Sequence, residues 1–226
     1  RYIEAPQQAG TLDVLCLPGT KSTIADLEWL RGCGWDKFIE RHLMAGGEMV
    51  GICGGYQMLG KRIDDPRHLE SEFDIINGLG LLDITTSFEG EKVTAAAGGT
   101  HVASGLPISG YEIHWGRIRR FGAEPLLMLS TPDVAAGTQF EGAIGYRGQV
   151  WGTSLHGLFD MPQFRRHLLN RIRQRKGLAP LEAVTPDAST VRDKAYYRLA
   201  QLVRKHLDLS AIAAMVDIEP ELLSER

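Results

Sequence analysis

The stretch EMVGICGGYQML, residues 48–59, decides the fold. Its first five residues form an apolar run typical of a buried strand, and the pattern from Tyr56 to about Lys61 predicts a helix. Cys53 stands between them among glycines, as at a turn so sharp that the central residue is strained and its neighbours must lack bulk. Such an elbow aims a helix N-terminus at the sulfur, which favours the thiolate. We therefore interpret Cys53 as a nucleophile; the alternative is a buried structural cysteine.

The residues before this stretch alternate between strand and helix patterns. Residues 11–17 are an apolar run that stops at a Pro-Gly turn, 18–19, as a buried strand does. Apolar positions at helical spacing predict a helix over 23–30, and a second helix over 35–45 ends at two glycines. Strand, helix, strand and helix in this order predict an α/β fold: a flavodoxin-like, mostly parallel sheet with helices on both faces.

The middle of the chain has a different pattern. Residues 79–118 contain short β-rich runs and many glycines, which predict a small antiparallel insertion in the α/β fold. Residues 142–154 predict a hairpin whose second strand delivers His156 at its end.

Helical patterns dominate the end of the chain. A strongly basic helix is predicted over 162–175, an amphipathic helix over 194–207 and a short one over 210–216. We expect one domain over residues 1–190 and a helical tail, 191–226, packed on it. Because residues 11–17 would normally be the second or third strand of such a sheet, we also expect that the domain is truncated here and lacks its first strand.

A cysteine that attacks a carboxamide needs a group that moves protons, because the leaving ammonia must be protonated. His156 is the best candidate among seven histidines, since it follows a predicted strand at the sheet edge where ligands bind. The alternative is a histidine satisfied in a loop. Backbone N–H groups of Gly54 and Gly19 are the natural oxyanion hole, because Gly19 lets the backbone approach closely.

Composition narrows the partners and the compartment. A formal net charge of −3 gives no argument for nucleic acid, and no apolar stretch approaches the length of a membrane span. Three cysteines without paired spacing argue against a disulfide framework and favour the cytoplasm. Since no zinc-ligand spacing is present, we expect no metal.

Together these pieces resemble the class I glutamine amidotransferases. The matching features are the Pro-Gly turn at 18–19, the elbow at 51–55, Gln57 and the late His156. The resemblance implies that Gln57 helps to hold the substrate glutamine. The chain departs from the family pattern at Leu158, where most members carry the glutamate that completes a catalytic triad. The amidotransferase domains of the cobalamin pathway share this loss.

Longer motifs select one branch. The stretches LPGTKSTIADL (17–27), GICGGYQMLG (51–60), GYEIHWG (110–116) and GTSLHGLFD (152–160) resemble the C-terminal glutaminase domains of the cobyric acid synthase family, and the resemblance covers almost the whole chain. It implies a ligase subunit in which glutamine supplies ammonia for ATP-dependent amidation of adenosylcobyrinic acid a,c-diamide at its b, d, e and g carboxylates. ATP and Mg would bind an upstream synthetase domain that also takes the corrinoid, since no phosphate-binding GxxxxGK[ST] loop occurs in these 226 residues.

Three alternatives remain open at this stage. One is an amidotransferase of the related a,c-diamide synthase, one is a domain that keeps the fold but only docks, and one is a cysteine hydrolase or chaperone of the DJ-1-like fold. His114 is equally consistent with a substrate-binding residue in the cleft and with a structural residue bonded to a loop. We assign no chemistry to Tyr111, Glu112 and Lys92, expect the latter two to be solvated, and place the other five histidines at the surface.

Overall fold

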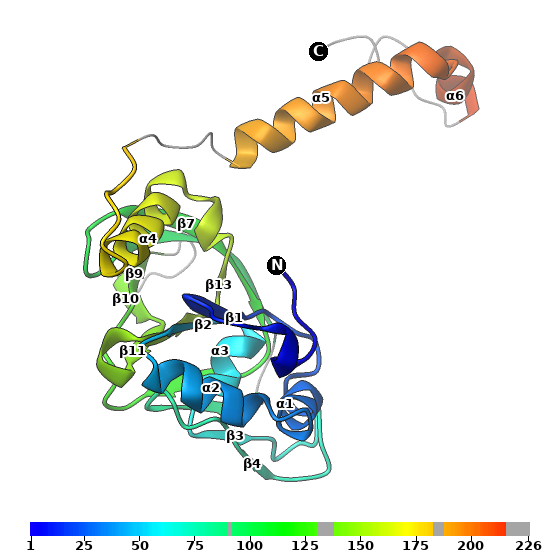
Figure 1. The fold of residues 1–226 in the computed structure, drawn as a ribbon. Helices are drawn as coiled ribbons and strands as arrows, with labels where there is room; N and C mark the ends of the chain where they lie inside the picture. Colours follow the sequence, from blue (N-terminus) through cyan, green and yellow to red (C-terminus); the bar gives the residue numbers. More distant parts are fainter. Residues whose placement is uncertain (90–91, 131–137, 183–187, 216–226) are drawn as a thin grey trace. The chain divides into compact units, whose positions relative to one another are not determined.

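The computed structural model describes residues 1–89, 92–130, 138–182 and 188–215, which belong to two compact units, 1–181 and 182–226 (Figure 1). The division falls after Leu181, whereas the sequence suggests a tail that begins at 191. The packing of the tail on the domain stays a prediction.

A four-stranded sheet forms the centre of the first unit. Its strands follow the order β1 (Val14–Leu17), β2 (Glu48–Ile52), β12 (Val150–Thr153) and β11 (Ala143–Gly145). The first three are parallel, and β11 pairs with β12 in the antiparallel direction across the short helix η2 (Tyr146–Gly148). The predicted strands around the elbow and the predicted hairpin are both confirmed.

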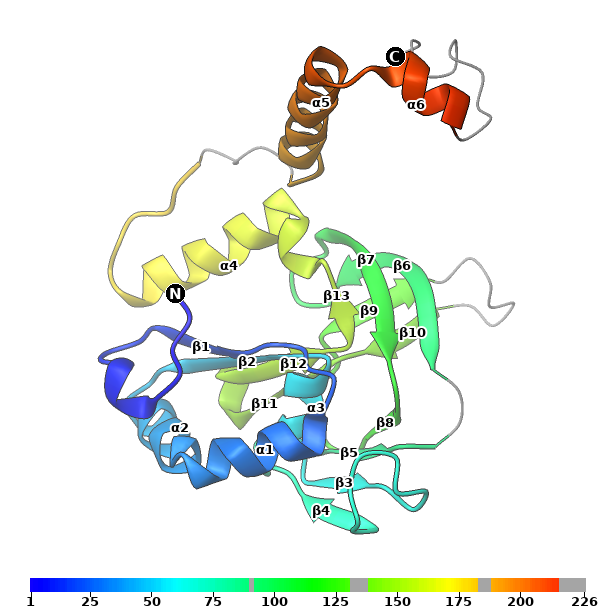
Figure 2. The same ribbon diagram turned by 90° about the vertical axis from the view of Figure 1, so that its right-hand side faces the viewer.

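Helices cover both faces of this sheet, as predicted (Figure 2). One face packs against α2 (Trp35–Met44) and α3 (Gly54–Leu59), and α1 (Thr23–Gly32) packs against these two helices. The other face packs against α4 (Pro162–Arg175). Alternation along β2 explains the division, because Met49 belongs to the core with α2 and α3, whereas its neighbour Val50 belongs to the core with α4.

A buried carboxylate anchors the basic helix α4. Glu48, at the start of β2, is fully buried and accepts a hydrogen bond from the Trp151 indole at 2.8 Å. It also pairs with Arg171 and with Arg175, the latter at 2.6 Å. Because an unpaired buried carboxylate is costly, these arginines fix the helix against the sheet.

The antiparallel part is larger than the small insertion predicted. A five-stranded sheet has the order β10 (Thr138–Glu141), β9 (Leu127–Ser130), β6 (Val93–His101), β7 (Pro107–His114) and β13 (Leu155–His156). A four-stranded sheet has the order β4 (Ile75–Asn77), β3 (Arg62–Asp64), β5 (Ile84–Ser87) and β8 (Arg117–Arg120). The first unit also contains the short helices η1 (Pro6–Gln8) and η3 (Leu158–Asp160).

The chain changes sheets just before His156. Strand β12 ends at Thr153, and β13 then pairs antiparallel with β7, so that His156 lies opposite Tyr111. The predicted hairpin strand therefore does not carry His156 at its own end, as we expected; a separate two-residue strand does.

The second unit contains α5 (Ala188–His206) and α6 (Leu209–Met215), which agree with the predicted amphipathic helix and short final helix. In the part of the chain that the structure describes, no helix combines the length and the apolar character needed to cross a membrane.

The elbow generates a prediction about stability. A Cβ atom at Gly55 would lie 2.7 Å from the backbone carbonyl carbon of Leu17, where only backbone movement could relieve the clash. We expect Gly55→Ala to lower the free energy of unfolding by about 3 kcal/mol, as overpacking does. The matched control is Gly32→Ala at the end of α1, where the added Cβ meets open space. Denaturant unfolding measures both variants, and equal stability of the two would contradict the packing described here.

Candidate active site

Cys53 occupies a strained elbow between β2 and α3. Its backbone has φ 51° and ψ −113°, a region that L-residues rarely adopt. Its N–H donates to the Thr153 carbonyl at 2.8 Å, and its own carbonyl accepts from the N–H of Gln57 at 3.0 Å. The strain predicted from the glycine-flanked sequence is therefore present, and hydrogen bonds from both sides hold it in place.

The elbow opens into a cavity of about 780 Å³. Five of the six residues predicted for the site border it: Gly19, Cys53, Gln57, His114 and His156. Gly54, the sixth, is buried directly behind Cys53 at the start of α3. Residues from all three sheets and from the turn after β1 meet here, although they are distant in the chain.

Two observations place Cys53 and His156 next to each other. A Cβ atom built on Gly19 would lie 3.2 Å from Cε1 of His156 and 3.4 Å from Cβ of Cys53, so both side chains flank the same point. The backbone carbonyl of Ile113 accepts a hydrogen bond from the Cys53 sulfur at 3.7 Å and also interacts with the His156 imidazole. The structure thus brings the predicted nucleophile and the predicted base together.

Burial raises the pKa of the Cys53 thiol. The Gly54 backbone at the start of α3 acts in the opposite direction, as predicted for a helix N-terminus, but Glu70 adds to the effect of burial. The expectation that the helix favours a thiolate is therefore correct in sign but outweighed, because α3 has only six residues and the cysteine is buried. Cys53 rests as a neutral thiol.

Burial also lowers the pKa of His156, and the nearby charge of His114 lowers it further, while the Ile113 carbonyl opposes both effects. A lowered pKa keeps the imidazole neutral at neutral pH, the form that accepts a proton. Within the described residues, Nε2 of His156 is buried and has no hydrogen-bond partner. Leu158, in the position where most class I relatives carry glutamate, is packed in the core.

His114 combines the two roles left open by the sequence. It borders the cavity, and its ring is held at Nδ1 by the Gly116 carbonyl, 3.2 Å away. Its Nε2 faces the Glu112 carboxylate at 3.6 Å. Burial acts to lower the pKa of His114, but Glu112 and the carbonyls of Gly116 and Trp115 together raise it. The expectation that Glu112 is solvated is wrong, because its side chain is only 16% exposed.

Gln57 ties the walls of the cavity together. Its Oε1 accepts from the Thr23 hydroxyl at 3.2 Å, and its Nε2 donates to the Trp115 carbonyl at 2.8 Å. These bonds connect α3 to the start of α1 and to the turn after β7. A role of Gln57 in holding substrate stays a prediction, since both ends of its amide already have protein partners.

Three charged residues at the cavity were missed by the sequence analysis: Lys21, Glu70 and Lys92. Lys21 lies within the quoted LPGTKSTIADL stretch, which offered a signal, whereas nothing local marks Glu70. Glu70 accepts from the Ile24 N–H at 3.1 Å, and burial raises its pKa.

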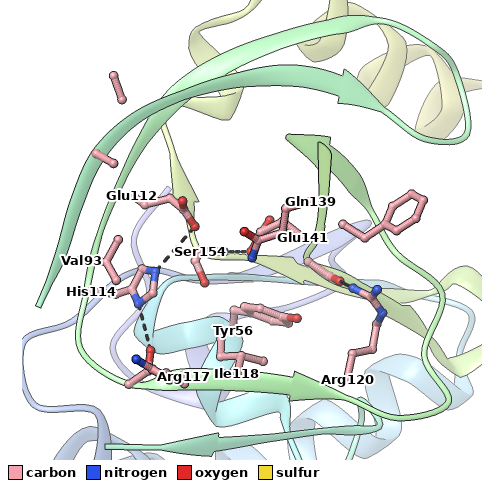
Figure 3. A pocket seen from close by; sticks show the side chains of 15 residues that line it. Tyr56, Val93, Glu112, His114, Arg117, Ile118, Arg120, Gln139, Glu141 and Ser154 are labelled. Carbon is pink, nitrogen blue, oxygen red and sulfur yellow. Dashed lines mark hydrogen bonds and ion pairs between the residues drawn. The ribbon is translucent and has the colours of Figure 1, made fainter. Parts of the chain in front are cut away.

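A second cavity, of about 450 Å³, shares His114 with the first (Figure 3). Its lining includes Glu141, a buried carboxylate that the sequence did not single out. Glu141 accepts from the hydroxyl of Thr153 and from the N–H of Ser154 at 2.7 Å. These bonds fix the bend between β12 and β13, and so the path of the chain that leads to His156.

The other histidines are not all at the surface, as we expected. His42 is buried and its Nε2 contacts the Glu48 carbonyl at 2.9 Å, and His101 is buried against Ser104 and Phe164. Both have packing roles away from the cavity. Among the described residues, no cluster of three or more histidine, cysteine or acidic side chains could hold a metal ion.

A cysteine at a strand-to-helix elbow, facing a histidine from a later strand, is typical of α/β enzymes that act through a Cys–His pair. Residues 1–164 match the CobB/CobQ-like glutamine amidotransferase domain family. The chain therefore belongs to this family.

Curated relatives agree with the assignment. The chain is 40% identical to the cobyric acid synthase of Dehalococcoides mccartyi strain BAV1 over 96% of its own length and 44% of that protein. It is 39% identical to the cobyric acid synthase of Clostridium acetobutylicum over 97% of its length, again covering 44% of the relative. The chain thus spans less than half of these proteins. One solved structure, described as a glutamine amidotransferase, is 18% identical with a TM-score of 0.48, over 78% of this chain and 85% of that one.

The raised pKa of Cys53 predicts its reactivity without substrate. Because the protonated thiol predominates at neutral pH, we expect iodoacetamide to alkylate Cys53 more slowly at pH 7 than it alkylates glutathione, with a rate that climbs only above pH of about 8.5. Peptide mass spectrometry of the full-length protein follows the reaction, with the exposed Cys33 as an internal reference. A rate that is already constant below pH 7 would instead indicate a resting thiolate.

Proposed function

We propose that this domain hydrolyses glutamine, with Cys53 as nucleophile and His156 as base, and supplies the ammonia to a synthetase region of a longer protein. The observation that carries the proposal is the meeting of a neutral thiol and a neutral imidazole at one cavity. Family membership supports glutamine as the substrate.

The charges around the cavity suit a zwitterionic amino acid. Lys21 and Lys92 offer cations for the α-carboxylate of glutamine, and Glu70 offers a carboxylate for its ammonium group. Bound between them, the substrate would extend its side-chain amide toward Cys53. Gln57 and His114 would border the bound amide.

The first half of the reaction forms a thioester. His156 takes the thiol proton, and the sulfur attacks the amide carbon, whose oxygen becomes an anion. Backbone N–H groups of Gly54 and Gly19 would stabilise that anion. When the C–N bond breaks, the imidazolium returns its proton to the leaving nitrogen, and ammonia departs.

The second half releases glutamate. Water takes the place of ammonia, His156 removes a proton from it, and the resulting hydroxide attacks the thioester carbon. The C–S bond breaks, the sulfur regains the proton from His156, and free Cys53 is restored.

The destination of the ammonia is inferred from the relatives, which carry the name cobyric acid synthase. We assign to the full-length protein the amidation of adenosylcobyrinic acid a,c-diamide at its b, d, e and g carboxylates. ATP and Mg would activate these carboxylates in the synthetase region, because the present 226 residues contain no GxxxxGK[ST] loop. Three free cysteines suit the cytoplasm as its compartment.

A diazo-ketone analogue of glutamine tests the nucleophile. We expect one covalent adduct in the full-length protein, located on Cys53 by mass spectrometry and absent in Cys53→Ser. Cys33→Ser, which changes an exposed cysteine at the end of α1, should label as the wild type does. An unlabelled wild-type protein would leave only a docking role for the domain.

The corrinoid substrate requires a separate assay. Full-length protein with glutamine, ATP and Mg should amidate the a,c-diamide and leave cobyrinic acid unchanged, as followed by mass spectrometry of the corrin. Isotopically labelled glutamine amide nitrogen should enter the product. Preferential amidation of cobyrinic acid at positions a and c would identify the related a,c-diamide synthase instead.

A further inference from the structure

The orientation of His156 has no carboxylate to account for it. Leu158 is 1% exposed in the core, and Nε2 of His156 has no hydrogen-bond partner among the described residues. An imidazole that is not held can rotate about its Cβ–Cγ bond, which moves both nitrogens away from the cysteine. A base that acts on Cys53 therefore needs another source of orientation.

We infer that Tyr111 is the positioning residue for His156, by stacking its ring on the imidazole; the inference rests on the proposed glutaminase function. The ring centroids are 5.1 Å apart and the ring planes differ by only 8°. Tyr111 and His156 are direct cross-strand partners in the β7–β13 pair.

The backbone makes this stacking possible. A Cβ atom on Gly110, the residue before Tyr111, would clash with the His156 carbonyl oxygen, so glycine allows β7 and β13 to approach closely at this point. Paired side chains on adjacent strands then lie within contact distance. The flat face of the tyrosine restricts rotation of the imidazole, because rotation out of the stacked plane would drive one ring into the other.

A second group on the same strand defines the edge of the imidazole. The Ile113 carbonyl interacts with the ring and also accepts from the Cys53 sulfur. Tyr111 thus fixes the plane of the base, and Ile113 marks the direction of the thiol within that plane. Strand β7 supplies both groups.

The exposure of Tyr111 separates positioning from folding. Its side chain is 52% exposed and belongs to none of the buried core clusters. Loss of the ring therefore removes little core packing, and an effect on catalysis can be measured in a folded protein.

The test compares Tyr111→Ala and Tyr111→Phe in the full-length protein. We expect Tyr111→Ala to lower kcat for glutamine hydrolysis by about ten-fold to a hundred-fold, as misplacement of a catalytic group does. KM should stay within about two-fold, because the tyrosine does not line the cavity. Tyr111→Phe, which keeps the ring, should restore kcat. Phe140→Ala is the matched control, since Phe140 lies in the same sheet and is 54% exposed.

Histidine ring signals supply an independent readout. In protein with isotope-labelled histidine, the His156 ring protons should be shifted upfield by the stacked ring in the wild type and in Tyr111→Phe, but not in Tyr111→Ala. His156→Asn assigns the signals, and thermal unfolding verifies that each variant is folded.

The outcomes separate this inference from the proposed function. A wild-type protein that labels at Cys53, together with a Tyr111→Ala variant as active as Phe140→Ala, would overturn the positioning role and leave the glutaminase intact. Loss of kcat in Tyr111→Phe equal to that in Tyr111→Ala would also overturn stacking as the cause. A wild type that neither labels nor hydrolyses glutamine would remove the reaction and the positioning role together.

Discussion

The left-handed backbone of Cys53 is the constraint on which the rest of the site depends. A residue with φ 51° and ψ −113° persists only where surrounding packing prevents its relaxation. Here β2 and α3 meet at that residue, and the neighbouring glycines allow the turn after β1 and the helix to close on it. The same contacts place the sulfur at the lip of the central sheet, where side chains from the antiparallel sheets can reach it.

Burial sets the protonation states around the sulfur. It holds the thiol and the imidazole neutral, so that no charge pair must be desolvated before substrate arrives. His114 behaves differently, because Glu112 favours its protonated form, and its charge in turn lowers the pKa of His156. The distribution of charge between two histidines thus depends on one mostly buried carboxylate.

Local sequence was sufficient for the elbow, the α/β class, the hairpin and the residues that border the cavity, since each carries its signal in a short stretch. Long-range features were not predictable in this way. The pairing of β13 with β7, the role of Glu141 at the bend and the burial of His42 and His101 depend on strands distant in the chain. The protonation of Cys53 was misjudged for a related reason: the helix N-terminus is visible in the sequence, whereas the amount of burial is not.

The Ile113 carbonyl has a consequence for how such a site changes over generations. This oxygen belongs to the main chain, so no single amino-acid exchange at position 113 deletes it, provided that the strand keeps its course. A side-chain carboxylate, by contrast, can be lost through one codon change. A domain that relies on a peptide oxygen beside its nucleophile can therefore accept leucine at position 158 and remain a plausible catalyst, with the requirement transferred from residue identity to strand geometry.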